Sequence, residues 1–74
     1  MKVLLFGMIA EMAGAEVLIA SASSLSALRR ELEARINGLH RVSYAIAVDR
    51  RIVREDLPLN GDEEIALLPP FAGG

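Results

Sequence analysis

The spacing of apolar residues along the chain predicts strands near both ends and one main helix between them. Residues 2–6 and 16–20 are short apolar runs typical of strands. The segment between them consists of good helix formers for about one turn and ends at Gly14, which suits a left-handed cap. The pattern therefore predicts a hairpin-like pair of strands with a turn of helix in its loop.

An amphipathic helix is the clearest predicted element. Ser23 or Ser24 can cap its first turn, and Asn37-Gly38 can end it. Apolar residues at spacings of three and four predict a buried stripe made of Leu25, Leu28, Leu32 and Ile36. Opposite charges lie four positions apart on the other face, Arg29 with Glu33 and Glu31 with Arg35. Such pairs are typical of a solvated helix face.

Three further strands are predicted after the helix. In residues 43–48 larger and smaller apolar residues alternate, so one face would carry Tyr44, Ile46 and Val48 and the other Ala45 and Ala47. Asp49-Arg50 is a candidate turn into a short strand at 51–53. Turn-forming residues 57–62 lead into a last strand at 64–68, which delivers the end of the chain.

This order of elements predicts an α+β fold in which one mixed sheet packs on one main helix. The β-grasp is the most economical form of that arrangement. A single helix covers only one face of the sheet, so apolar residues on the other face would be exposed unless a partner covers them. We therefore expect one domain over residues 1–74, with a protein-binding surface on the open face of its sheet.

Composition excludes several function classes. Of 74 residues 53% are hydrophobic, which is enough for one small core. No apolar run approaches the roughly 20 residues of a membrane span, and the opening run is too short for a signal peptide, which favours a cytoplasmic protein without membrane contact. The net charge is −2 and the few aromatic residues are scattered, unlike a nucleic-acid-binding surface. We expect no nucleic-acid partner.

The side chains offer little chemistry of their own. The chain has no cysteine, which excludes disulfides, thiolate-bound metals and a cysteine persulfide on this chain. His40 is the one histidine and lies in Leu39-His40-Arg41, a predicted surface connection, which favours a solvated side chain. Asp62, Glu63 and Glu64 fit turn chemistry and a solvated strand edge, with metal binding or a basic partner as alternatives. We expect no metal and no bound cofactor.

The tail, residues 69–74, is the most informative segment. Gly73-Gly74 lacks side chains, so a terminal carboxylate there can enter a narrow channel of another protein. Pro69-Pro70 fixes the backbone and predicts a stiff lead into a flexible Gly-Gly end. Phe71 either fills a pocket on a partner or folds back on its own sheet. The candidate partner-binding residues are Pro69, Pro70, Phe71 and Ala72, and the candidate reactive residues are Gly73 and Gly74.

The motifs, taken in order, resemble the small subunit of molybdopterin synthase, a ubiquitin-like sulfur carrier. The resemblance covers nearly the whole chain and rests on residues 3–7, 9–14, 47–49 and 60–74. Its most specific part is the sequence of a glycine-acid turn, an apolar strand, a Pro-Pro pair and a closing Gly-Gly. Three positions depart from the family, which often has a basic residue, an asparagine and a small β-branched residue where this chain has Ala10, Asp49 and Phe71.

The resemblance implies a sulfur donor that is not catalytic alone. As in the family, a ubiquitin-activating-type adenylyltransferase would use ATP to adenylate Gly74, and sulfur from a cysteine desulfurase relay would displace AMP to leave a thiocarboxylate. The tail, with Gly73 as its slim neighbour, would then enter the large subunit of molybdopterin synthase. There it would give sulfur to cyclic pyranopterin monophosphate in molybdenum cofactor biosynthesis. The family suggests a heterotetramer of the two subunits.

Three other functions stay open at this point. A sulfur carrier for thiamine thiazole synthesis shares the fold, the Gly-Gly end and the activation chemistry but usually lacks the Pro-Pro lead, so Pro69-Pro70 favours the pterin acceptor. A ubiquitin-like modifier would instead end as an isopeptide on substrate lysines. A plain interaction module, whose tail has no function, would keep its activity without Gly73-Gly74.

Overall fold

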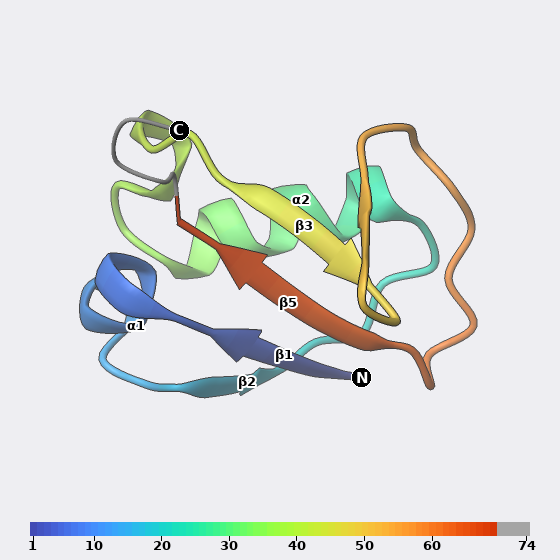
Figure 1. Cartoon of the computed structure of the whole chain (residues 1–74), viewed down its shortest axis with the longest axis horizontal. Helices are drawn as coiled ribbons and strands as arrows, with labels where there is room; N and C mark the ends of the chain where they lie inside the picture. Colours follow the sequence, from blue (N-terminus) through green and yellow to red (C-terminus); the bar gives the residue numbers. More distant parts are fainter. Residues whose placement is uncertain (70–74) are drawn as a thin grey trace.

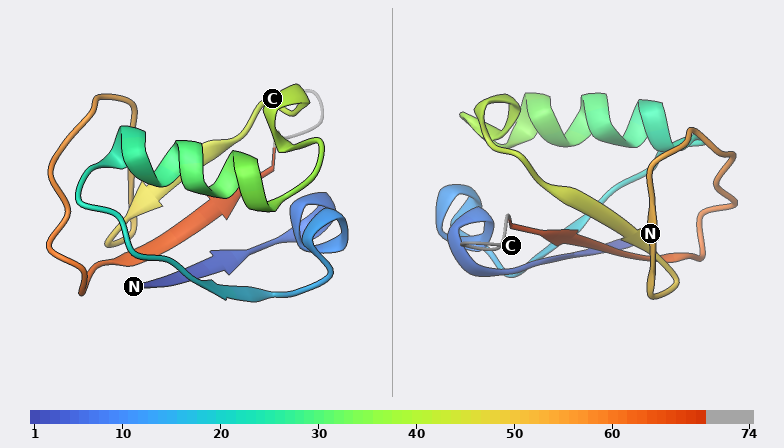
Figure 2. Two further views of the ribbon diagram at one scale, coloured as in Figure 1. Left: turned by 180° about the vertical axis from the view of Figure 1, so that it is seen from behind. Right: turned by 45° about the horizontal axis from the view of Figure 1, so that its top comes forward.

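The computed structural model describes residues 1–69 as one five-stranded sheet with a long helix across one face (Figures 1 and 2). Its elements, in chain order, are β1 (Lys2–Leu5), α1 (Gly7–Ala13), β2 (Val17–Ile19), α2 (Leu25–Arg35), a 3-10 turn (Leu39–Arg41), β3 (Ala45–Val48), β4 (Arg51–Val53) and β5 (Glu64–Leu68). Over this range no helix has the length and apolar character needed to cross a membrane.

The sheet is mixed and has the strand order β2-β1-β5-β3-β4. The first and last strands of the chain, β1 and β5, pair in parallel at its centre, and β2, β3 and β4 pair antiparallel with their neighbours. One mixed sheet over one main helix is the predicted α+β, β-grasp arrangement, and the prediction is confirmed.

The core lies between α2 and the facing side of the sheet. The predicted stripe of α2 is buried throughout, with Leu28 and Leu32 fully inaccessible. Every second residue of β1 and β5 meets it, because side chains alternate between the faces of a strand. The buried sheet residues at the centre of this layer are Val3, Leu5, Ile46, Ile65 and Leu67.

The start of α2 is held by two separate acceptors. The Ser24 hydroxyl accepts a hydrogen bond from the Ala27 N–H at 3.2 Å, which confirms one of the two predicted caps. The Asp56 carboxylate accepts from both the N–H and the hydroxyl of Ser26, at 2.8 and 3.0 Å. These bonds hold the pKa of Asp56 below its ordinary value. The loop before β5 is thereby tied to the helix.

Two short segments differ from their predictions. The helix α1 has seven residues rather than one turn, although Gly14 ends it in the predicted left-handed conformation, with φ of 69°. Leu39 was predicted in a surface connection, and this is wrong: it is fully buried, because Gly38 at φ 87° turns the chain back under α2 into a 3-10 turn. The neighbouring His40 is exposed, as predicted.

The outer side of α2 forms one of its two expected ion pairs. Glu31 and Arg35 lie 3.1 Å apart. Glu33 instead accepts a hydrogen bond from the Tyr44 hydroxyl at 2.7 Å, and the Arg29 guanidinium lies 5.2 Å from the centre of the Tyr44 ring. Burial of the ring, followed by the bond to Glu33, raises the pKa of Tyr44 to about 12.

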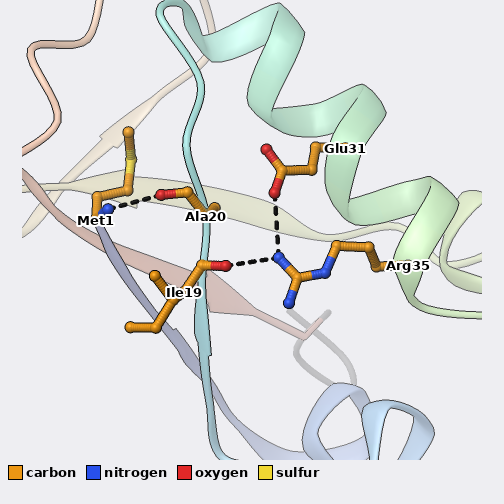
Figure 3. Close-up of polar contacts among 5 residues, drawn as sticks. All are labelled: Met1, Ile19, Ala20, Glu31 and Arg35. Atoms are coloured by element: carbon orange, nitrogen blue, oxygen red, sulfur yellow. Dashed lines mark hydrogen bonds and ion pairs between the residues drawn. The ribbon is translucent and has the colours of Figure 1, made fainter.

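The edge strand β2 is covered from the helix side (Figure 3). Arg35 donates to the Ile19 carbonyl at 2.6 Å, and the same guanidinium nitrogen pairs with the Glu31 carboxylate at 3.1 Å. The Met1 amino group donates to the Ala20 carbonyl, also at 2.6 Å. Free carbonyls on an edge strand invite pairing with another chain, and Arg35 occupies one of them, the carbonyl of Ile19.

Candidate functional site

The tail begins at the end of the central strand. β5 is hydrogen-bonded to β1 on one side and to β3 on the other, and the last pairs of these ladders are Leu5 with Leu67 and Ala45 with Leu68. Pro69 follows directly and is half-buried. Because β5 is hydrogen-bonded to a strand on each side, its end is held in place, and the tail starts from a fixed point.

Around this point the chain exposes apolar side chains. β1 ends beside β5, and Phe6 and Met8, which flank Gly7 at the start of α1, are each 46% exposed. α1 itself contacts β5. The end of the sheet from which the tail departs therefore combines exposed large apolar groups with a rigid base.

Of the predicted site residues, the structure describes one. Pro69 lies at the base of the tail, and its role in partner binding stays a prediction. Pro70, Phe71, Ala72, Gly73 and Gly74 lie outside the described residues, so their roles stay predictions.

The face of the sheet opposite α2 carries a continuous apolar row. Cross-strand partners lie on the same face of a sheet, and the pairing aligns one residue from each strand: Val17, Leu4, Ala66, Ala47 and Ile52. We call these five residues the open-face row. Val17 and Ile52 at its two ends are 44% and 53% exposed. Ala66 and Ala47 in the middle of the row have small side chains, so the surface is shallow there. Ala47 lies on the face opposite Ile46, as predicted.

Two charged residues and one exposed isoleucine border the row on the side away from the tail. The next row along the strands contains Ile19, Lys2 and Glu64. Arg50 lies 3.6 Å from Glu64. On the tail side the adjacent pair is Leu68 with Ala45, which is again apolar. The apolar surface is therefore continuous from the open-face row to the base of the tail.

The acidic turn before β5 is structural. Glu63 accepts hydrogen bonds from the N–H groups of Asn60 and Gly61, at 2.7 and 2.9 Å, and these bonds lower its pKa. The N–H of Glu64 donates to the Asp49 carboxylate at 2.9 Å. The turn interpretation is confirmed for Glu63. Among residues 1–69 no group of three or more His, Cys, Asp or Glu side chains could hold a metal ion.

Asp49, one of the departures from the resembled family, sits in a two-residue hairpin turn. Asp49 and Arg50 both have positive φ, 51° and 70°, as the preferred tight hairpin turns require. The oxygen that Asp49 presents to Glu64 would be present in asparagine as well. Ala10, another departure, packs against the core from α1.

Comparison with protein families matches residues 3–74 to the ThiS family. The chain belongs to this family. Comparison with individually curated proteins found no match. As a ThiS-family member the chain is a small sulfur carrier with a ubiquitin-like β-grasp fold, and such carriers work with partner enzymes. The match includes residues 69–74, so the tail of this carrier falls within the family's own domain.

Sequence reasoning predicted an exposed apolar face for this ThiS-family carrier but identified only the two alanines of β3 on it. Leu4, Val17, Ala66 and Ile52 were assigned to strands without a face. The alternation of side chains within each short strand could have identified these residues, but it shows which residues share a sheet face only after the register between the strands is known. Register is a property of the pairing and not of any one run.

Proposed function

We propose that this carrier is the sulfur-donating small subunit of molybdopterin synthase and that Gly74 carries the sulfur as a terminal thiocarboxylate. The observation that supports this most is the delivery of the tail from the central strand β5 through Pro69-Pro70, within a family match that reaches Gly74. In this proposal the catalytic groups belong to the partner enzymes, and the chain itself acts as the donor. Its contribution is one reactive carbonyl at the end of a stiff lead.

The chemistry follows from the weakness of a carboxylate as an acyl donor. Adenylation of Gly74 by ATP releases pyrophosphate and makes AMP the leaving group. A sulfide-level sulfur nucleophile then forms a C–S bond as the C–O bond to AMP breaks. Where the donor is a persulfide, the product is an acyl disulfide, and a thiol of the donor protein cleaves its S–S bond to leave the thiocarboxylate and a disulfide on the donor. This route loads sulfur on a chain that has no cysteine. In the transfer step the thiocarboxylate sulfur bonds to a carbon of the acceptor and displaces an oxygen substituent, and water then breaks the C–S bond to Gly74 and restores the carboxylate.

The open-face row is the docking surface of this proposal. An adenylyltransferase and the large subunit must each hold the carrier while the tail reaches their reacting atoms. The row is apolar, low at Ala47 and Ala66, and continuous with the base of the tail through Leu68. A partner covering it would bury Val17 and Ile52, the most exposed apolar groups of the row. Lys2 and Glu64 at its border would fix the orientation.

A pterin acceptor is favoured over a thiazole precursor by the Pro69-Pro70 lead. Proline fixes φ, so two in succession hold the segment extended and reduce the entropy lost when the tail enters a channel. The thiazole acceptor is the second candidate, because the family match accommodates both.

Intact-mass measurement of the chain isolated from its host, with fragmentation of the last peptide, tests the proposal. The expected result is a mass gain equal to the replacement of one oxygen by sulfur, located on Gly74. The loaded carrier should then convert cyclic pyranopterin monophosphate in the presence of the large subunit, and removal of Gly74 should abolish that conversion while the fold persists. An unmodified carboxylate in cells making the cofactor would contradict the proposal. Isopeptide conjugates between Gly74 and lysines of other proteins would instead show that the chain is a ubiquitin-like modifier.

A further inference from the structure

A glycine lies against the first residue of the tail. Gly7 begins α1 with φ of +55°, directly after β1. A Cβ at this position would lie 3.2 Å from Cγ of Pro69 and 4.0 Å from its Cβ. Carbon atoms in ordinary contact are about 3.5 to 4.0 Å apart. The proline ring therefore occupies space that is open only because residue 7 has no side chain.

Pro69 is the partner that would move if residue 7 had a side chain. The strand β5 ends at Leu68, so Pro69 lies beyond the ladder, and its nitrogen has no hydrogen to donate to a neighbour. Residue 7 is held more firmly, because it lies between β1 and a helix whose Ile9 is fully buried. A methyl group at position 7 would therefore be accommodated by displacement of the proline and not of the helix.

We propose that Gly7 is a positioning residue for the tail. By leaving room for the Pro69 ring it sets the position of the residue from which the tail continues. This inference rests on the proposed function, in which Gly74 must reach the reacting atoms of a docked enzyme. A shift of Pro69 changes the point from which the tail must reach those atoms. Misplacement of a reacting group by about 1 Å can lower a rate by about a hundredfold.

The test compares Gly7→Ala with Gly14→Ala. Both glycines have left-handed φ, 55° and 69°, so both variants carry the backbone strain of a side chain in that region. A Cβ at residue 14 meets nothing within 4 Å, so only the residue 7 variant collides with the tail. Adenylation of Gly74 by the host's adenylyltransferase, followed as ATP–pyrophosphate exchange, gives kcat and KM for each variant.

We expect Gly7→Ala to lower kcat about tenfold with KM nearly unchanged, since docking through the open-face row is intact. Gly14→Ala should stay within about twofold of the unmodified chain in both constants. Pro69→Ala removes the Cγ that a methyl at residue 7 would meet and keeps the more distant Cβ. In that background the addition of Gly7→Ala should lower kcat less than about twofold, which is the coupling expected of two residues in contact.

Equal constants for Gly7→Ala and Gly14→Ala would overturn the positioning role, as would a full Gly7→Ala effect in the Pro69→Ala background. Failure of the unmodified chain to be adenylated would overturn the proposed function itself, and the two failures are thereby distinguished. Matching unfolding midpoints for the two alanine variants would show that the difference in kcat is not a difference in stability.

Discussion

The two faces of the sheet are built by the same strands, yet they differ in what covers them. Facing α2, the β5 residues Ile65 and Leu67 are fully inaccessible. On the opposite face, their neighbours Ala66 and Leu68 are only half-buried, and Ile52 on the edge strand is 53% exposed. Both faces are apolar. One is covered by the protein's own helix, and the other remains available to a second protein.

Because of this difference, residues on the covered face mainly determine the stability of the fold, and residues on the open face mainly determine binding to a partner. On the covered face each apolar group removed from water stabilises the fold. On the open face the same kind of group contributes little to folding, because part of its surface stays in water. A small carrier with one main helix thus has an apolar face available for docking without weakening its core. Substitutions on the two faces should accordingly affect different measurements.

The largest expected effect comes from truncating the covered face. Leu67→Ala should lower the free energy of unfolding by about 2–5 kcal/mol, the range for a fully buried leucine. Leu68→Ala, one residue further along the same strand but on the open face, should cost about 1 kcal/mol or less. Urea unfolding at neutral pH measures both. Similar costs for the two leucines would contradict the assignment of the faces.

The next effect is on binding. Ile52→Ser on the open-face row should weaken the complex with the adenylyltransferase about tenfold, or about 1.4 kcal/mol. It should change the free energy of unfolding by less than about 0.5 kcal/mol, because the side chain is mostly in water. Ala34→Ser, exposed on α2, is the matched control and should change neither. Titration calorimetry gives the affinities. A weakened complex for the α2 variant would place the docking surface on the helix side.

The smallest effect is a pH dependence on the helix side. Since hydrogen bonds from Ser26 hold the pKa of Asp56 below its ordinary 3.8, the ionised carboxylate stabilises the fold above that value. This stabilisation is lost as the pH falls through the lowered pKa. Asp56→Asn should therefore melt below the unmodified chain at neutral pH, and the gap should close as the pH falls from neutral through the lowered pKa of Asp56.

Glu55→Gln, an exposed neighbour, is the control for the Asp56 prediction, and thermal melting across this pH range is the measurement. A gap between Asp56→Asn and the unmodified chain that stays constant down to low pH would show that the carboxylate charge is not what anchors the helix.

The sequence was sufficient for elements whose signal is local. The last strand was predicted with its observed bounds, residues 64–68, because an apolar run there follows strong turn residues. The stripe of α2 and the left-handed Gly14 follow from spacing and from glycine's conformational freedom. The fold class followed from the order of these elements, and the family match supports it.

Contacts between distant parts of the chain could not be predicted in the same way. Asp56 and Ser26 are 30 residues apart, and nothing in either neighbourhood indicates the other. The prediction of an exposed Leu39 is wrong because the short polar stretch around it is typical of a loop, and only the fold places its side chain under α2. The approach of Gly7 to Pro69 depends on the parallel pairing of the first and last strands. The chemistry of Gly73-Gly74 remains a prediction from the motif.

The parallel pairing of β1 and β5 also determines where a fusion partner can be attached. The amino terminus and Pro69 lie at opposite ends of these two strands (Figure 1), and the register with a rise of about 3.3 Å per residue separates them by roughly 20 Å along the sheet. An amide at Met1 would still offer one N–H to the Ala20 carbonyl, so an affinity tag or a surface linker joined there keeps that bond. Immobilised through its amino end, the carrier would present its opposite end, with the tail, to the solution.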